Sequence, residues 1–136
     1  MYSNNGGNNN VAIGSQAQYS GASLSNSVAI GVNSQFVSSG SYNVSIGTNT
    51  LRFNTTGISN TAVGEVALNA NTIGNYNVGL GHAALYSNTT GSNNTAVGYQ
   101  AGYSNTVGID NVCFGYRAGY SATGSLAVSI GYLAGY

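Results

Sequence analysis

Residues 94–110, NTAVGYQAGYSNTVGID, form one unit of a pattern that recurs along the whole chain. The tetrapeptide Thr-Ala-Val-Gly ends at Gly98, and equivalent glycines recur at intervals of 17, 16, 17, 17, 17, 17 and 16 residues. These glycines are Gly14, Gly31, Gly47, Gly64, Gly81, Gly98, Gly115 and Gly131. A fixed period of this length is the signature of a repeat protein whose units stack on one another.

Each of these glycines follows a triplet of large, small and large residues, such as Val44-Ser45-Ile46. This alternation is typical of a β-strand, whereas the glycine and asparagine clusters would break a helix. We therefore predict an all-β fold, a parallel β-solenoid of about eight coils of 16–17 residues, as one domain over 1–136. We expect the Val and Ile side chains to point inward, so that Ile46→Asp or Val63→Asp would abolish folding.

Polar residues recur in phase with the glycines. Seven of eight coils have Asn or Ser four residues before the glycine: Asn10, Ser27, Asn43, Asn60, Asn77, Asn94 and Asn111. Five coils have Thr eight residues after it: Thr55, Thr72, Thr89, Thr106 and Thr123. These residues also favour turns in general, but a turn preference does not explain their constant phase. We favour ladders that are hydrogen-bonded from coil to coil.

The composition excludes several classes of function. The chain has two Lys or Arg residues, two Asp or Glu residues, one His and one Cys. Nucleic-acid binding needs clusters of basic residues, and metal sites need three or four ligands, so we expect neither a nucleic-acid partner nor a metal or other cofactor. No apolar run approaches the ~20 residues of a membrane-spanning helix. We therefore predict a protein that is not an enzyme.

Two segments carry a resemblance to a known family. Residues 94–103 and 86–98 resemble the repeats of phage and virus tail-fibre-like proteins, and residues 27–31 are more distantly similar to the head repeats of trimeric autotransporter adhesins. The resemblance covers essentially the whole chain, although the adhesin repeat is usually a little shorter than 17 residues. It implies a left-handed parallel β-roll, a trimer of chains packed side by side, and an extracellular, cell-surface or virion location.

The functional hypothesis is a fibre or filament segment that displays an adhesive or receptor-binding surface, with cell-surface glycans as candidate ligands. The alternative is an ice-binding solenoid that uses the threonine column. Ice-binding faces usually have two parallel threonine ranks, and the neighbouring position here varies, as Thr56, Ile73 and Val107 show. Ice affinity and glycan binding would separate the two hypotheses.

Aromatic residues provide the candidate contact sites: Tyr99, Tyr116, Tyr132, Tyr103 and Tyr120. The first three lie one residue after the repeat glycine, in coils where a leucine of the middle coils is replaced by glycine. Because aromatic rings can cover strand glycines, we favour a packing role for these three over glycan contact.

Other positions have a simpler expectation. The small residues, such as Ala12 and Ala17, would allow chains to approach closely. Glu65 and His82 are expected to form a weak surface pair, and Cys113 is expected to be a buried filler.

The two ends of the sequence share one phase of the repeat. Tyr2 and Tyr136 both occupy the position five residues after a repeat glycine, real or extrapolated. Matching ends would permit head-to-tail stacking into a filament, and the alternative is a fragment of a longer fibre. We favour the filament slightly, because polymerisation requires this match.

Overall fold

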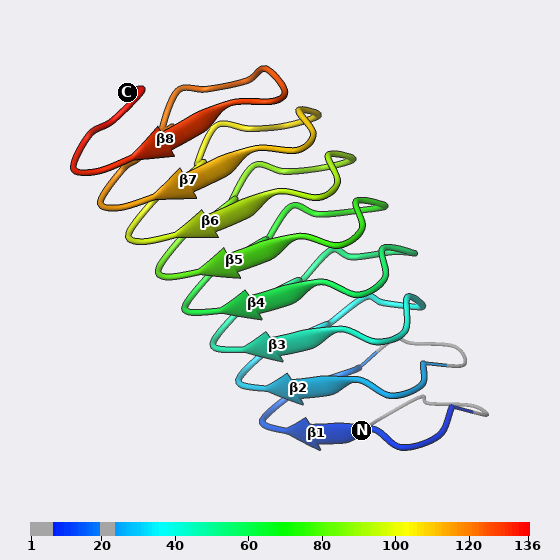
Figure 1. Cartoon of the computed structure of the whole chain (residues 1–136). Helices are drawn as coiled ribbons and strands as arrows, with labels where there is room; N and C mark the ends of the chain where they lie inside the picture. Colours follow the sequence, from blue (N-terminus) through cyan, green and yellow to red (C-terminus); the bar gives the residue numbers. More distant parts are fainter. Residues whose placement is uncertain (1–6, 20–23) are drawn as a thin grey trace.

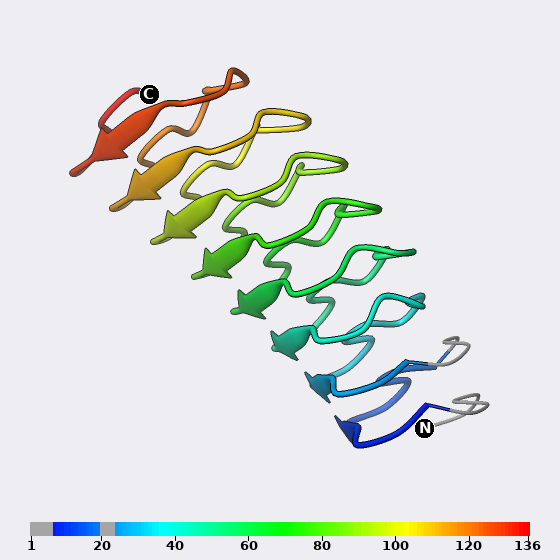
Figure 2. The same ribbon diagram turned by 45° about the vertical axis from the view of Figure 1, so that its right-hand side comes forward.

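The computed structural model describes residues 7–19 and 24–136, and over these ranges it is an all-β parallel solenoid. Eight three-residue strands stack in sequence order in one sheet, as Figures 1 and 2 show. They are β1 (Val11–Ile13), β2 (Val28–Ile30), β3 (Val44–Ile46), β4 (Thr61–Val63), β5 (Val78–Leu80), β6 (Thr95–Val97), β7 (Val112–Phe114) and β8 (Val128–Ile130). The predicted fold class is confirmed. Tyr2, on which the matching phase of the ends depends, lies outside the described residues.

The repeat glycines fix the register of the stack. Equivalent residues pair from strand to strand, so that Ile46 lies opposite Val63. Gly47 has a φ of 133°, and a Cβ atom on it would lie 2.8 Å from the backbone carbonyl of Gly64 in the next coil. Only glycine fits this conformation and this close approach, which explains why the period is so strict.

Three further corners in each coil have left-handed backbone conformations. In the coil around Gly81 these are Tyr76, Ala83 and Leu85, with φ of 57°, 56° and 51°. Such values are uncommon outside glycine, and they recur here because each corner is held by hydrogen bonds to the neighbouring coils. The Tyr76 amide, for example, donates to the Ile58 carbonyl at 3.1 Å.

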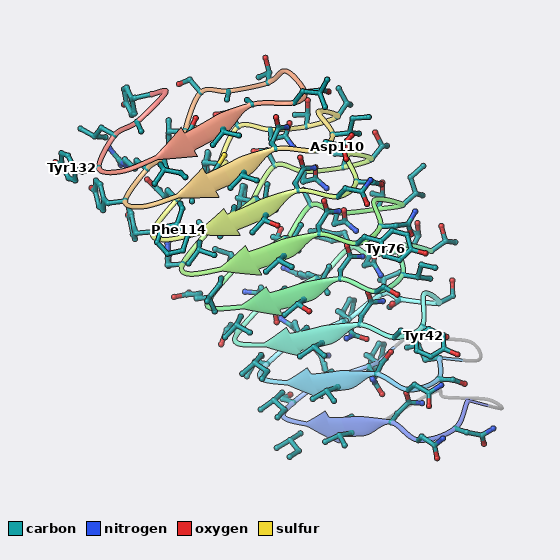
Figure 3. All side chains as sticks on the ribbon, viewed as in Figure 1. Tyr42, Tyr76, Asp110, Phe114 and Tyr132 are labelled. Atoms are coloured by element: carbon teal, nitrogen blue, oxygen red, sulfur yellow. The ribbon has the colours of Figure 1, made fainter. Side chains whose placement is uncertain are left out.

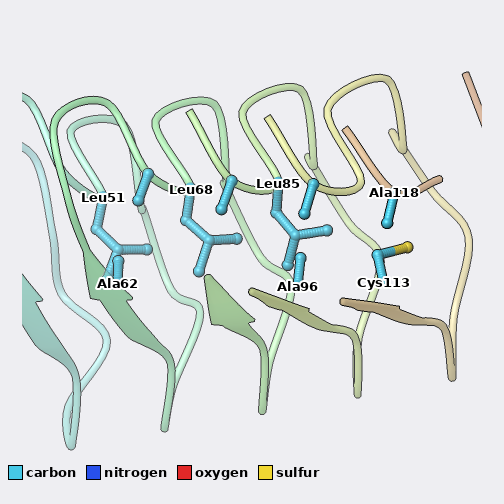
Figure 4. Close-up of a cluster of buried hydrophobic side chains, with 10 residues drawn as sticks. Leu51, Ala62, Leu68, Leu85, Ala96, Cys113 and Ala118 are labelled. Carbon is cyan, nitrogen blue, oxygen red and sulfur yellow. The ribbon is translucent and has the colours of Figure 1, made fainter. Parts of the chain in front are cut away.

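The core is a thin layer inside the coil, and Figure 4 shows it from the side. Leu51, Leu68 and Leu85 stand four residues after the repeat glycines and are completely or almost completely buried. They point toward small residues in the middle of the facing strands, such as Ala62 and Ala96. The left-handed backbone of the leucines turns these side chains into the interior.

The predicted orientation of the strands is wrong. The middle, small residue of each triplet points inward, and the large residues on either side of it point outward. Ser45 is completely buried, whereas its neighbour Ile46 is 38% exposed. The leucine layer and the asparagine ladders fill most of the coil, so the strand can contribute only a small side chain. The small residues Ala29 and Ala17 are buried within the chain, which also contradicts a contact role between chains for these two columns.

The asparagine ladders are confirmed. Asn77 and Asn94 are completely buried, and each donates from Nδ2 to the Oδ1 of the asparagine one coil earlier, at 3.2 and 3.1 Å. A second ladder joins Asn54, Asn71 and Asn88, with Nδ2 to Oδ1 distances of 2.8 Å. Buried amides need such partners, so the ladders stabilise the turns from within.

Candidate functional site

The outward side of the sheet is the largest candidate surface. We call it the sheet face: the first and third residues of all eight strands. Its third-residue row contains only large apolar side chains, including Ile13, Leu80 and Phe114, which are 59%, 45% and 54% exposed. None of the eight strands that the structure describes contains a charged residue. A continuous exposed apolar patch on a protein of this size marks an interaction site.

Two rows of stacked aromatic rings run along the last coils. The first tyrosine row begins with His82 and continues through Tyr99, Tyr116 and Tyr132, with ring centroids 5.2–5.3 Å apart. The second tyrosine row contains Tyr86, Tyr103, Tyr120 and Tyr136, with centroids 5.1–5.3 Å apart. The five tyrosines predicted as contact residues therefore fall into two parallel rows. Figure 3 shows Tyr132 pointing away from the ribbon, at the side opposite Tyr42 and Tyr76.

The predicted packing role of the first tyrosine row is wrong. Gly102 replaces the core leucine, but the nearest atoms to a Cβ placed there belong to Leu85, Ala96 and Cys113. Tyr99 stands outside the coil and is 41% exposed. Its ring stacks on its neighbours in the row, and the side chains of Leu85, Ala96 and Cys113 border the space of the missing leucine instead.

Arg117 lies between the two tyrosine rows. Its guanidinium carbon is 5.6 Å from the ring centroid of Tyr116 in the first row and 5.1 Å from that of Tyr120 in the second. Its Nε donates to Oε1 of Gln100 at 2.7 Å, which fixes the side chain against the stack. Cation–π contacts of this kind stabilise a half-buried guanidinium without removing its charge.

The stacked rings also affect ionisation. Burial, and to a lesser extent the neighbouring phenols Tyr86 and Tyr120, raise the pKa of Tyr103 above its ordinary value. The physical cause of the second effect is that adjacent stacked phenolates repel each other. Tyr103 therefore keeps its proton at physiological pH.

The remaining candidate positions carry no site. Cys113 is buried as predicted, and burial raises the pKa of its thiol. His82 stacks on Tyr99, and within the described ranges no ion pair joins it to Glu65. Residues 7–19 and 24–136 contain no group of three or more His, Cys, Asp and Glu side chains that could hold a metal ion. The same residues include no helix long and apolar enough to cross a membrane.

Sequence reasoning missed two parts of this surface. The sequence pattern places the sheet face in the core, whereas the structure places Leu68 and the buried asparagines there. The repeat does not mark Arg117, because only one coil has an arginine two residues after the repeat glycine, but its position directly after Tyr116 and one repeat after Gln100 is the signal that could have found it. No family model, curated protein or solved structure matches the chain.

Proposed function

We propose that the chain is a structural fibre segment whose copies associate through the sheet face and display the tyrosine rows as an adhesive surface. The observation that carries this proposal is the exposure of large apolar side chains on β1, β3, β5, β7 and β8, with partly exposed outward side chains on β2, β4 and β6 and no charged residue in any of these eight strands. Covering these rows removes apolar area from water, the dominant driving force of association. An extracellular or virion-associated location and a trimer are the corresponding proposals for its setting and assembly.

The geometry of the solenoid suits a fibre. Its backbone amides bond mainly to the neighbouring coils, as the Gly64 amide does to the Ile46 carbonyl at 2.8 Å. Length therefore grows by adding coils without any change of the cross-section. Stacking of coils end to end between chains remains a separate prediction, which electron microscopy for elongated particles tests.

Ice binding ranks lower because the threonine hydroxyls have internal partners. Oγ1 of Thr55, Thr72 and Thr89 each donates to the carbonyl of the threonine in the next coil, at 2.9–3.0 Å. A hydroxyl that donates to the backbone has less capacity to order water. The position after each threonine is mixed, since Ile73 is an exposed isoleucine where other coils have threonine.

The test compares two exposed apolar residues. Leu80 lies on the sheet face and Ile73 lies in a turn, and they are 45% and 50% exposed. In native mass spectrometry and sedimentation, we expect oligomers for the wild type and for Ile73→Asp, and folded monomers for Leu80→Asp. Circular dichroism checks the fold of each variant. A wild type that stays monomeric at all accessible concentrations would contradict the proposal.

A further inference from the structure

We propose that Arg117 and the two tyrosine rows bind an extended polysaccharide that carries carboxylate groups and lies along the axis of the stack. This inference deepens the adhesive part of the proposed function, on which it rests, by naming the class of ligand. It goes beyond the sheet face, because the tyrosine rows and Arg117 lie outside the strands.

The guanidinium of Arg117 carries a charge that no acidic side chain in the described part of the chain neutralises. Its Nε is occupied by Gln100, and no carboxylate lies within ion-pair distance of it in the described part of the chain. The two Nη groups therefore keep their hydrogens for a ligand. A guanidinium presents a planar fork that matches a carboxylate through two parallel hydrogen bonds. Because the rings shield part of the group from water, this pairing is stronger than at a fully exposed site.

The tyrosine rows present groups that can form hydrogen bonds with a ligand. Within each row the faces of neighbouring rings are turned toward one another, with interplanar angles of 8° for Tyr99 and Tyr116 and 11° for Tyr103 and Tyr120. Neighbouring rings cover much of each other's faces, so the rows present mainly ring edges and hydroxyls. Phenolic hydroxyls both donate and accept hydrogen bonds, which suits a ligand rich in hydroxyl groups.

The distance between neighbouring rings of a row is close to the repeat of an extended sugar chain. Ring centroids in the rows follow one another at 5.1–5.3 Å. In an extended β-1,4-linked chain each sugar advances by about the length of one pyranose ring, which is close to this spacing. Successive sugars face opposite sides, so groups on one side of the chain recur at every second ring of a row and stay in step with it. An extended peptide would place side chains on one side every ~6.6–6.8 Å, so an acidic peptide falls out of step with the rows. The spacing therefore favours a polysaccharide over a peptide.

Arg52 provides an internal control. Its guanidinium carbon lies 5.7 Å from the ring centroid of Phe36 and 5.1 Å from that of Phe53, so it has the same type of cation–π contact. These two rings have no hydroxyl, and in the described part of the chain the ring stacked on Phe36 is that of one tyrosine, Tyr19, in place of a row. Arg52→Gln therefore removes an equal charge from a surface that lacks the proposed hydrogen-bonding row.

The experiment measures binding by calorimetry with β-1,4-linked uronic acid oligosaccharides of two, four and six residues. Matched probes are neutral β-1,4-linked oligosaccharides, sulfated oligosaccharides and a polyglutamate peptide of similar length. We expect the affinity to increase from two to four uronic acid residues and to exceed that for every matched probe. Arg117→Gln should weaken binding about tenfold or more, since hydrogen bonds to charged groups are the strong ones.

Three further variants sharpen the result. Arg117→Lys keeps the charge without the planar fork and should give an intermediate loss. Tyr116→Phe removes one hydroxyl and keeps the stack, so it should weaken binding severalfold. Tyr76→Phe, at an exposed turn on another corner, and Arg52→Gln should bind like the wild type.

Several outcomes would overturn the site. These are no binding of any uronic acid probe, equal binding by Arg117→Gln, equal binding of polyglutamate, or equal loss from Arg52→Gln. Tighter binding of the sulfated probe would show that the surface recognises negative charge alone, which would contradict the proposed pairing of Arg117 with a carboxylate. Sedimentation of the same samples separates the two proposals, because a chain that remains monomeric yet binds the uronic acids supports this site while contradicting the fibre.

Discussion

The middle coils and the last coils have the same backbone, but the middle coils have their large side chains inside the coil and the last coils have them outside. In the middle coils Leu51, Leu68 and Leu85 fill the interior, and the position after the repeat glycine is Thr48 or Glu65 in two of them. In the last coils the leucine positions are glycines, and tyrosines stand after the repeat glycine instead. A coil can therefore be stabilised from inside by a leucine or from outside by a stacked ring, while the hydrogen bonds between coils stay the same.

The largest expected effect is the loss of an interior leucine. Leu68 is completely buried between the leucines of the two adjacent coils. Leu68→Ala should lower the free energy of unfolding by about 2–5 kcal/mol, because the thin core cannot collapse around the cavity. Chemical denaturation measures this loss, and amide hydrogen exchange should show that the middle coils lose the most protection. A smaller loss of unfolding free energy than that of Tyr120→Ala would show that the leucines are not the main support of the middle coils.

The equivalent substitution in the last coils removes a ring. Tyr120 stacks on Tyr103 and Tyr136 and lies under the Arg117 guanidinium. Tyr120→Ala should cost about 1–3 kcal/mol, since each aromatic pair contributes about 0.5–1.5 kcal/mol. Denaturation under the conditions used for Leu68→Ala tests this value. No measurable destabilisation would show that the rows do not support the coils and serve display alone.

A third substitution sharpens the comparison at a corner that both regions share. Val66 has a φ of 54°, which is strained for a β-branched residue, and Gln100 occupies the same position in a later coil. Asn33 and Asn49 stand at this corner in earlier coils and are joined side chain to side chain at 3.0 Å. Val66→Asn should therefore stabilise the chain by about 1 kcal/mol. Gln100→Val introduces the same β-branched strain and also removes the acceptor of the Arg117 Nε hydrogen bond, so it should destabilise the chain by more than this.

The smallest effect depends on pH and is confined to the tyrosine rows. The folded state raises the pKa of Tyr103, so the unfolded chain loses this proton first as the pH increases. The contribution of Tyr103 to the free energy of unfolding is therefore fully present below the ordinary tyrosine pKa of about 10 and decreases as the pH rises above it. Tyr103→Phe should leave stability at pH 7 almost unchanged and reduce this alkaline loss. An unchanged alkaline slope would contradict the assignment.

Much of the fold could be predicted because the spacing of the glycines defines the repeat. The backbone of Gly64 approaches that of Gly47 too closely for any side chain, so the period, the parallel sheet and the register follow from sequence. The asparagine ladders were predictable for a similar reason, since a buried amide such as Asn77 must keep its phase to find a partner.

The orientation of the strands could not be predicted from alternation alone. A period of two separates two faces but does not say which one is inside, and hydrophobicity pointed to Ile46 in place of Ser45. Volume decides the question, because the interior already holds the leucines at left-handed corners, a conformation that sequence patterns rarely reveal for leucine. The surface site around Arg117 could not be predicted for another reason: arginine occupies this position of the repeat in one coil, so it forms no periodic pattern.

The most direct test of the account is sedimentation velocity of Ile46→Asp. Ile46 lies on the sheet face, where an aspartate stays in water in the separate chain and opposes the packing of copies. We predict a compact, folded monomer from a wild type that sediments as an oligomer. An expanded or aggregated variant would show that Ile46 belongs to the core, and an unchanged oligomer would show that the sheet face is not the contact.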